Sequence, residues 1–115
     1  MHELSIALNI VDGVLEQLKD HEGAEVSAVH VRIGRLAGVD KEALLFSYQV
    51  ACQDTVLEGS RLAIEELDVV IFCPLCKRET AIAGFPLLTC ATCGAAAERV
   101  IHGTELEIIA MEVAS

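Results

Sequence analysis

Two pairs of cysteines constrain this 115-residue chain more than any other feature. Cys73 and Cys76 form one C-x-x-C motif, and Cys90 and Cys93 form a second after a spacer of thirteen residues, 77–89. Each motif can aim two thiolates at one point, so two motifs joined by a short hairpin supply a closed tetrahedral set of four sulfurs. Such a set is typical of zinc. Because the protein would fill all four positions, the predicted zinc is structural and not catalytic.

The same cysteines allow two other interpretations. Two disulfides would require an oxidising compartment, but the apolar segment near the N-terminus is interrupted by polar residues and has no signal-peptide cleavage site. Iron in the same sulfur cage would give a rubredoxin-like electron carrier, since tetrahedral sulfur sites suit both metals. Zinc is favoured because the cage is a small insert in a larger domain. The fifth cysteine, Cys52, is predicted to be a small buried hydrophobe.

Composition and charge narrow the classes of function. Apolar residues make up 53% of the chain, which predicts a folded core. The formal charge of −10 opposes binding to nucleic acid and favours cations and basic partners. No stretch is long enough to cross a membrane, and we expect a cytoplasmic protein. The chain has no nucleophile elbow and no phosphate-binding glycine loop, so no enzyme class is indicated.

The pattern of apolar residues predicts an α+β fold. Helical spacing over residues 4–18 and 41–52 predicts two helices, the second with Asp40 as its N-cap. Residues 26–33, 61–72 and 105–113 are predicted to be strands. We expect the two helices to pack on one face of a three-stranded sheet that carries an inserted zinc-ribbon or rubredoxin-like module. The predicted division is an α+β domain of residues 1–72 and 97–115 and a zinc-binding module of residues 73–96.

The N-terminus offers a second metal-binding pattern. The Met1 amine, the next backbone nitrogen and the His2 imidazole can form fused chelate rings around one metal, with the Glu3 carboxylate nearby. Nitrogen-rich tetragonal sites suit Ni(II) or Cu(II). On the residues alone, an ordinary terminal histidine is the better interpretation, because chain ends are usually poorly tied down. His102, which follows the cysteine motifs, is predicted to be a turn residue.

These motifs together resemble the HypA/HybF family, the hydrogenase nickel-incorporation proteins. The resemblance rests on residues 1–7 (MHELSIA), on residues 31–34 (VRIG) with Asp40 shortly after, and on the paired C-x-x-C set. It runs from residue 1 to about Glu112. It implies an N-terminal nickel-binding domain, a zinc module, and delivery of nickel to a hydrogenase large-subunit precursor. It also implies a partner GTPase of the same maturation pathway (HypB type).

The resemblance also assigns roles to residues. By position, the nickel ligands are the His2 imidazole, the Met1 amine and Glu3, and Asp40 matches a position near the site. Asp40 is as well explained as a helix N-cap, and the two roles do not exclude each other. We therefore predict a nickel metallochaperone with Ni(II) as cargo and Zn2+ as a structural ion. The alternatives are a zinc-ribbon interaction module without nickel and the iron electron carrier. A module inserted between two strands would also allow a domain-swapped homodimer.

Overall fold

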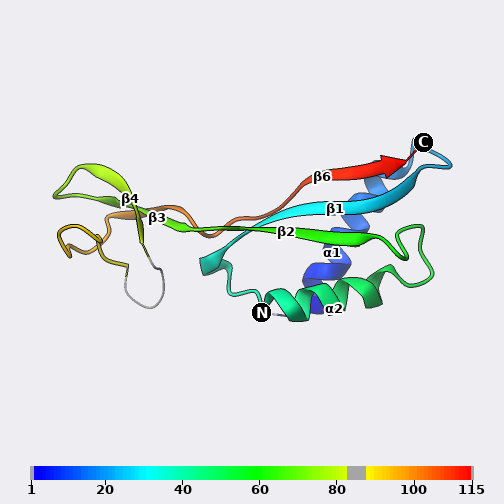
Figure 1. Ribbon diagram of the computed structural model, residues 1–115, viewed down its shortest axis with the longest axis horizontal. Coiled ribbons are helices and arrows are strands. Elements are labelled where there is room, and N and C mark those ends of the chain that lie inside the picture. The colour runs from blue at the N-terminus through cyan, green and yellow to red at the C-terminus, as the bar shows by residue number, and fades with distance from the viewer. Residues whose placement is uncertain (1, 83–87, 115) are drawn as a thin grey trace. The chain divides into compact units, whose positions relative to one another are not determined.

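The fold is described from a computed structural model, in which residues 2–82 and 88–114 are described (Figure 1). Met1 and the middle of the spacer between the cysteine motifs lie outside these ranges. Along the chain the elements are α1 (Glu3–Leu18), β1 (Glu25–Gly34), the 3-10 turn η1 (Arg35–Ala37), α2 (Lys41–Cys52), β2 (Arg61–Leu67), β3 (Val69–Cys73), β4 (Arg78–Ile82), β5 (Arg99–His102) and β6 (Leu106–Ala114).

The larger sheet has three strands in the order β2-β1-β6, and both helices supply side chains to the core beside it. The central strand β1 buries Val29 and Val31 almost completely, with exposed fractions of 0% and 1%. Its intervening polar residues His30 and Arg32 are half-exposed, as the alternation predicts. The core is completed by apolar residues of the helices, which are Ile6, Ala7, Ile10, Val11, Val14, Leu44, Tyr48 and Cys52. The predicted α+β fold, with two helices against a three-stranded sheet, is therefore confirmed.

The chain divides into two compact units. The first holds residues 1–31, 39–64 and 108–115, and includes both helices. The second holds residues 32–38 and 65–107, and includes all four cysteines of the paired motifs. The predicted functional division into a nickel-binding domain and a zinc-binding module of residues 73–96 stays a prediction.

The predicted strand over residues 61–72 is in fact two strands that belong to different sheets. β2 ends at Leu67, and β3 begins at Val69 as the central strand of a second three-stranded sheet, β4-β3-β5. Asp68 separates them and accepts a hydrogen bond from Arg35 Nε at 3.0 Å. Because both strands are extended, their alternating apolar residues form one continuous pattern in the sequence. The change of sheet depends on which segments pair with each strand, and this pairing is not visible in a local pattern.

The second unit has a small core. Its hydrophobic cluster is formed by the buried residues Val69, Ile71, Cys73 and Cys90, and two of these four are cysteines. β3 pairs antiparallel with β4, from Val69 opposite Ile82 to Cys73 opposite Arg78. Small cores of this kind are marginally stable, and bound metal commonly adds the missing stability.

Two glycines of the second unit lie at a close approach of the backbone. Gly34 N–H donates to Glu105 O at 2.8 Å, and Leu36 N–H donates to Gly103 O at 2.7 Å. A Cβ atom added to Gly34 would lie 2.1 Å from the carbonyl carbon and oxygen of Gly103. No side chain fits there, which gives a physical reason for the glycine in the VRIG motif.

Candidate metal centre

The two C-x-x-C motifs form turns with the same backbone plan. Cys73 is the last residue of β3, and Lys77 N–H donates back to Cys73 O at 2.8 Å. In the second turn Gly94 N–H donates to Cys90 O at 2.9 Å. Lys77 and Gly94 both have a left-handed backbone, with φ of 54° and 77°. Each turn is therefore a knuckle in which a left-handed residue after the second cysteine closes the loop.

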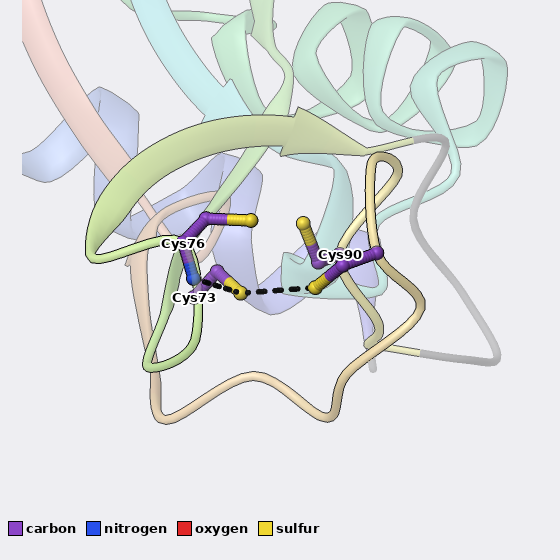
Figure 2. Close-up of side chains that lie close together, drawn as sticks. Cys73, Cys76 and Cys90 are labelled. Carbon is purple, nitrogen blue, oxygen red and sulfur yellow. Dashed lines mark hydrogen bonds between the residues drawn. The ribbon is translucent and has the colours of Figure 1, made fainter.

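The knuckles bring four sulfur atoms together. The four Sγ atoms all lie within 4.8 Å of one another, and Cys73 Sγ is 3.5 Å from Cys93 Sγ. Figure 2 shows the side chains of Cys73, Cys76 and Cys90 lying close together, with Cys76 N–H donating to Cys73 Sγ at 3.3 Å. A tetrahedral ion with metal–sulfur distances of 2.3 Å would hold its sulfurs about 3.8 Å apart. Both the donor atoms and their spacing therefore fit zinc.

The thiols of the cluster differ in how readily they lose a proton. Backbone N–H groups of Cys93 and Thr92 donate toward Cys90 and lower the pKa of its thiol to about 6. Hydrogen bonds with the thiols of Cys93 and Cys73 raise the pKa of Cys76 to about 12. Without a metal, the Cys76 thiol therefore keeps its proton at neutral pH. A metal must displace thiol protons to bind, so acid weakens its binding.

A basic side chain links the two knuckles. Arg78 follows the first knuckle directly, and its Nη2 donates to Thr92 Oγ1 in the second at 3.2 Å. Arg99 is engaged elsewhere, because its guanidinium lies 4.4 Å from the centre of the Phe72 ring and pairs with Glu98. Arg78 is therefore the arginine that joins the two cysteine turns.

At the start of the chain, Glu3 and Asp40 hold the N-termini of α1 and α2 together. Glu3 Oε2 accepts a hydrogen bond from Asp40 N–H at 3.3 Å, and Asp40 Oδ1 accepts one from Ala43 N–H at 3.1 Å. The predicted N-cap at Asp40 is thus confirmed. His2 is the N-cap residue of α1, and its exposed side chain makes no capping hydrogen bond. Glu3 and Asp40 therefore meet in the first unit and His2 directly precedes Glu3, whereas Met1 lies outside the described residues.

Two polar clusters of the structure were not predicted from the sequence. His102 ends β5, and its Nδ1 lies 3.0 Å from Glu105 Oε2, while Gly103 N–H donates to Glu105 Oε1 at 2.7 Å. On the larger sheet, Glu112 Oε2 lies 2.8 Å from His30 Nε2 and accepts a hydrogen bond from Arg61 Nη2 at 3.3 Å. Polar residues alternating along the predicted strands were the available signal for the second cluster, but their cross-strand register could not be read from sequence.

Comparison with known proteins identifies the family. The family model described as "Hydrogenase/urease nickel incorporation, metallochaperone, hypA" matches residues 1–113. The chain belongs to the HypA family. This is a family of nickel-incorporation metallochaperones for hydrogenase maturation.

Relatives along the whole chain agree with this assignment to the HypA family. The hydrogenase maturation factor HypA of Chloroflexus aurantiacus is 45% identical over 112 residues, which cover 97% of this chain and 98% of the relative. That of Thermomicrobium roseum is 36% identical over 128 residues, with 98% of each chain covered. The solution structure of the Ni metallochaperone HypA from Helicobacter pylori has the same fold, with a TM-score of 0.67, 20% identity and 97% of each chain covered. Within the described residues, none of the helices has the length and apolar character needed to cross a membrane.

Proposed function

We propose that this chain binds Ni(II) at its N-terminus and delivers it to a hydrogenase under maturation, while the four cysteines hold a structural zinc ion. The contact between Glu3 and Asp40 supports the nickel part of the proposal, because Glu3 directly follows His2 and its carboxylate accepts a hydrogen bond from Asp40 N–H. The close set of four sulfurs carries the zinc part.

The proposed nickel ligands are the Met1 amine, the His2 imidazole and Glu3, with Asp40 as a nearby carboxylate. Nitrogen-rich sites suit Ni(II), and a free α-amine followed by histidine supplies an amine, a backbone nitrogen and an imidazole nitrogen from two adjacent residues. The His2 side chain is exposed, so it can meet a metal without first leaving a partner in the core. A site of few local ligands on an exposed terminus allows ligand exchange, which suits a metal that must be handed on.

The carboxylates have an electrostatic role in this proposal. The N-termini of α1 and α2 carry partial positive charge, which would repel a cation. Glu3 and Asp40 lie at these two ends and offset that charge. Asp40 uses Oδ1 for its cap. Its other oxygen can therefore serve the metal while the helix stays capped.

The zinc ion would stabilise the second unit. The four ligands of this ion come from the first knuckle, which follows β3, and from the second knuckle. One ion would therefore join segments that are twenty residues apart, at Cys73 and Cys93. All four positions are thiolates, which leaves no open position for catalysis. Iron would fit the same cage, and a red protein as isolated would favour the rubredoxin-like reading instead.

The expected partners follow from the family. We propose delivery in the cytoplasm to a hydrogenase large-subunit precursor, together with a HypB-type GTPase of the same pathway. A homodimer, with or without exchange of the cysteine module, is compatible with the fold.

The experiment that tests the nickel site is a Ni(II) titration of untagged, zinc-loaded protein with its native N-terminus. His2→Ala should weaken nickel binding by about tenfold or more. His21→Ala is the matched control, because His21 is an exposed histidine beyond the other end of α1, and it should bind like the parent. Equal nickel binding by His2→Ala and the parent would overturn the proposal and favour a zinc-stapled interaction module without nickel.

A further inference from the structure

The first unit contains a groove that neither proposed metal site uses. It has a volume of about 340 Å³ and is lined by Gly13, Val14 and Gln17 of α1 and by residues 108–111 of β6. Successive residues of a strand point to opposite faces of its sheet. A groove lined by four consecutive residues therefore runs along the edge of β6, next to its main chain.

β6 is an outer strand of the sheet, as its place in the order β2-β1-β6 shows (Figure 1). Over the described residues, one of its edges pairs with β1 and the other has no strand beside it. Ile108 and Ile109 are each 40% exposed and Val113 is 49% exposed. Residues 106–114 contain no lysine and no proline, the residues that commonly protect a free edge from further pairing. This edge can therefore accept another strand.

Gly13 keeps the groove open. A Cβ atom at this position would lie 3.2 Å from Ile108 Cδ1, so any larger side chain would take up the space between α1 and β6. Glycine in the middle of a helix is unfavourable for helix stability. At Gly13 the missing side chain leaves space between α1 and β6.

The charge beside the groove indicates what kind of segment fits. Glu16 and Asp20 are both exposed. Glu16 follows the groove residue Gly13 by three positions on α1, and Asp20 lies in the turn directly after the helix. Residues three apart on a helix are surface neighbours, so Glu16 places a carboxylate beside Gly13, and Asp20 adds a second acidic residue at the end of α1. Lys19 offsets part of this charge through its ion pair with Glu16 at 3.1 Å, but the chain as a whole carries −10.

We propose that this groove binds an extended segment of a partner protein, rich in basic residues and with apolar residues at alternate positions. The segment adds to the free edge of β6 as a fourth strand. Its apolar side chains enter the groove over Gly13 and Val14, and its basic side chains meet Glu16 and Asp20. A second copy of β6 is a poor occupant of this groove, because it would place the acidic residues Glu107 and Glu112, and no basic residue, next to Glu16 and Asp20.

The test uses the zinc-loaded full chain, labelled with 15N, and an acetylated peptide of alternating valine and lysine residues. A peptide in which glutamate replaces lysine is the matched control. Amide shifts should concentrate at residues 108–114 and in α1 near Gly13. The lysine peptide should bind about tenfold or more tightly than the glutamate peptide, and this preference should shrink as salt is added.

Variants of the chain distinguish peptide binding in the groove from nonspecific binding elsewhere on the surface. Gly13→Leu fills the groove and should weaken binding of the lysine peptide by about tenfold, whereas Ser5→Leu adds the same side chain to an exposed position of α1 outside the groove and should not. The double variant Glu16→Lys and Asp20→Lys leaves the groove intact and should reverse the preference between the two peptides.

Any of three results with the peptides would overturn the proposal. These are equal binding of both peptides, shifts that fall outside α1 and β6, and full binding of the lysine peptide by both the Gly13→Leu and the double variant. Shifts of the β6 amides that grow with protein concentration in the absence of peptide would make a second copy of the chain the occupant, and would also overturn it.

Discussion

The carboxylate of Glu3 accepts a hydrogen bond from the backbone N–H of Asp40 at 3.3 Å, and thereby joins the first turns of α1 and α2. Asp40 in turn caps α2 through Ala43 N–H. The Asp40 side chain therefore caps α2 and, in our proposal, also lies near a nickel ion. The two roles can be separated by substitution, because they require different properties of the same side chain.

Asp40→Asn and Asp40→Ala should have different effects on stability and on nickel. Asparagine caps helices about as well as aspartate, whereas alanine at an N-cap costs about 1 kcal/mol. We expect only Asp40→Ala to lower the free energy of unfolding, measured by urea denaturation. Both variants should weaken nickel binding if the charge matters. Full nickel affinity in Asp40→Asn would restrict Asp40 to its capping role.

The matching backbone of the two knuckles predicts opposite effects of two substitutions. Lys77 has a side chain in a left-handed conformation, so Lys77→Gly should stabilise the zinc-loaded protein by about 0.5–1 kcal/mol. Gly94→Ala should destabilise it by about 1 kcal/mol from backbone strain alone, since nothing lies within 4 Å of the added Cβ. Thermal unfolding of both variants checks the pair. A loss of stability in Lys77→Gly would show that the knuckles are not equivalent.

The contact between Gly34 and Gly103 predicts a large effect of one methyl group. In Gly34→Ala the new Cβ would overlap the Gly103 carbonyl, so we expect a loss of about 3 kcal/mol or more. Gly38→Ala is the control, because Gly38 has a left-handed backbone but nothing within 4 Å, and it should cost only about 1 kcal/mol. Equal losses in the two variants, measured by chemical denaturation, would contradict the close approach.

The cluster of His30, Arg61 and Glu112 predicts a stability that depends on pH. The hydrogen bond with His30, followed by the charges of His30 and Arg61, holds the pKa of Glu112 below its usual range. A lowered carboxyl pKa stabilises the fold above the pKa of the unfolded state, and this contribution is lost as the pH falls through the lower, folded value. In Glu112→Gln, the free energy of unfolding should therefore fall less steeply than in the parent as the pH is lowered. Glu58→Gln, an exposed substitution outside this cluster, should leave the acid profile unchanged.

Removal of zinc should unfold the second unit before the first. Below about pH 6 even the Cys90 thiol is protonated in the metal-free protein, so competition between protons and zinc is strongest there. Treatment with a chelator at this pH should broaden the amide signals of residues 69–102, while α1 and α2 retain their helical circular dichroism. Loss of both sets of signals together would show that the units unfold as one.

Much of the fold could be predicted from local patterns. Apolar spacing located both helices, and Asp40 marked the start of the second, because caps and amphipathic faces are properties of neighbouring residues. The second sheet could not be predicted in this way. Its strands pair Val70 with His102 and Phe72 with both Glu79 and Arg99, and such pairings depend on contacts between distant segments.

The candidate sites show the same contrast. The spacing of the cysteines predicted that their sulfurs would meet, because a C-x-x-C turn fixes the geometry of its own two thiolates. The contact of Glu3 with Asp40 joins residues that are far apart in sequence, and only the family resemblance brought them together. The close approach of Gly34 to Gly103 was not predicted, because a glycine does not reveal which backbone segment lies against it.

The proposed nickel site depends most on the Met1 amine, and the most direct measurement is the Ni(II) affinity of the chain acetylated at this amine. Acetylation removes the amine as a ligand and leaves every side chain in place. We predict that nickel affinity falls by about tenfold or more, while one equivalent of zinc is retained. Unchanged nickel affinity in the acetylated chain would contradict an N-terminal site that uses the amine.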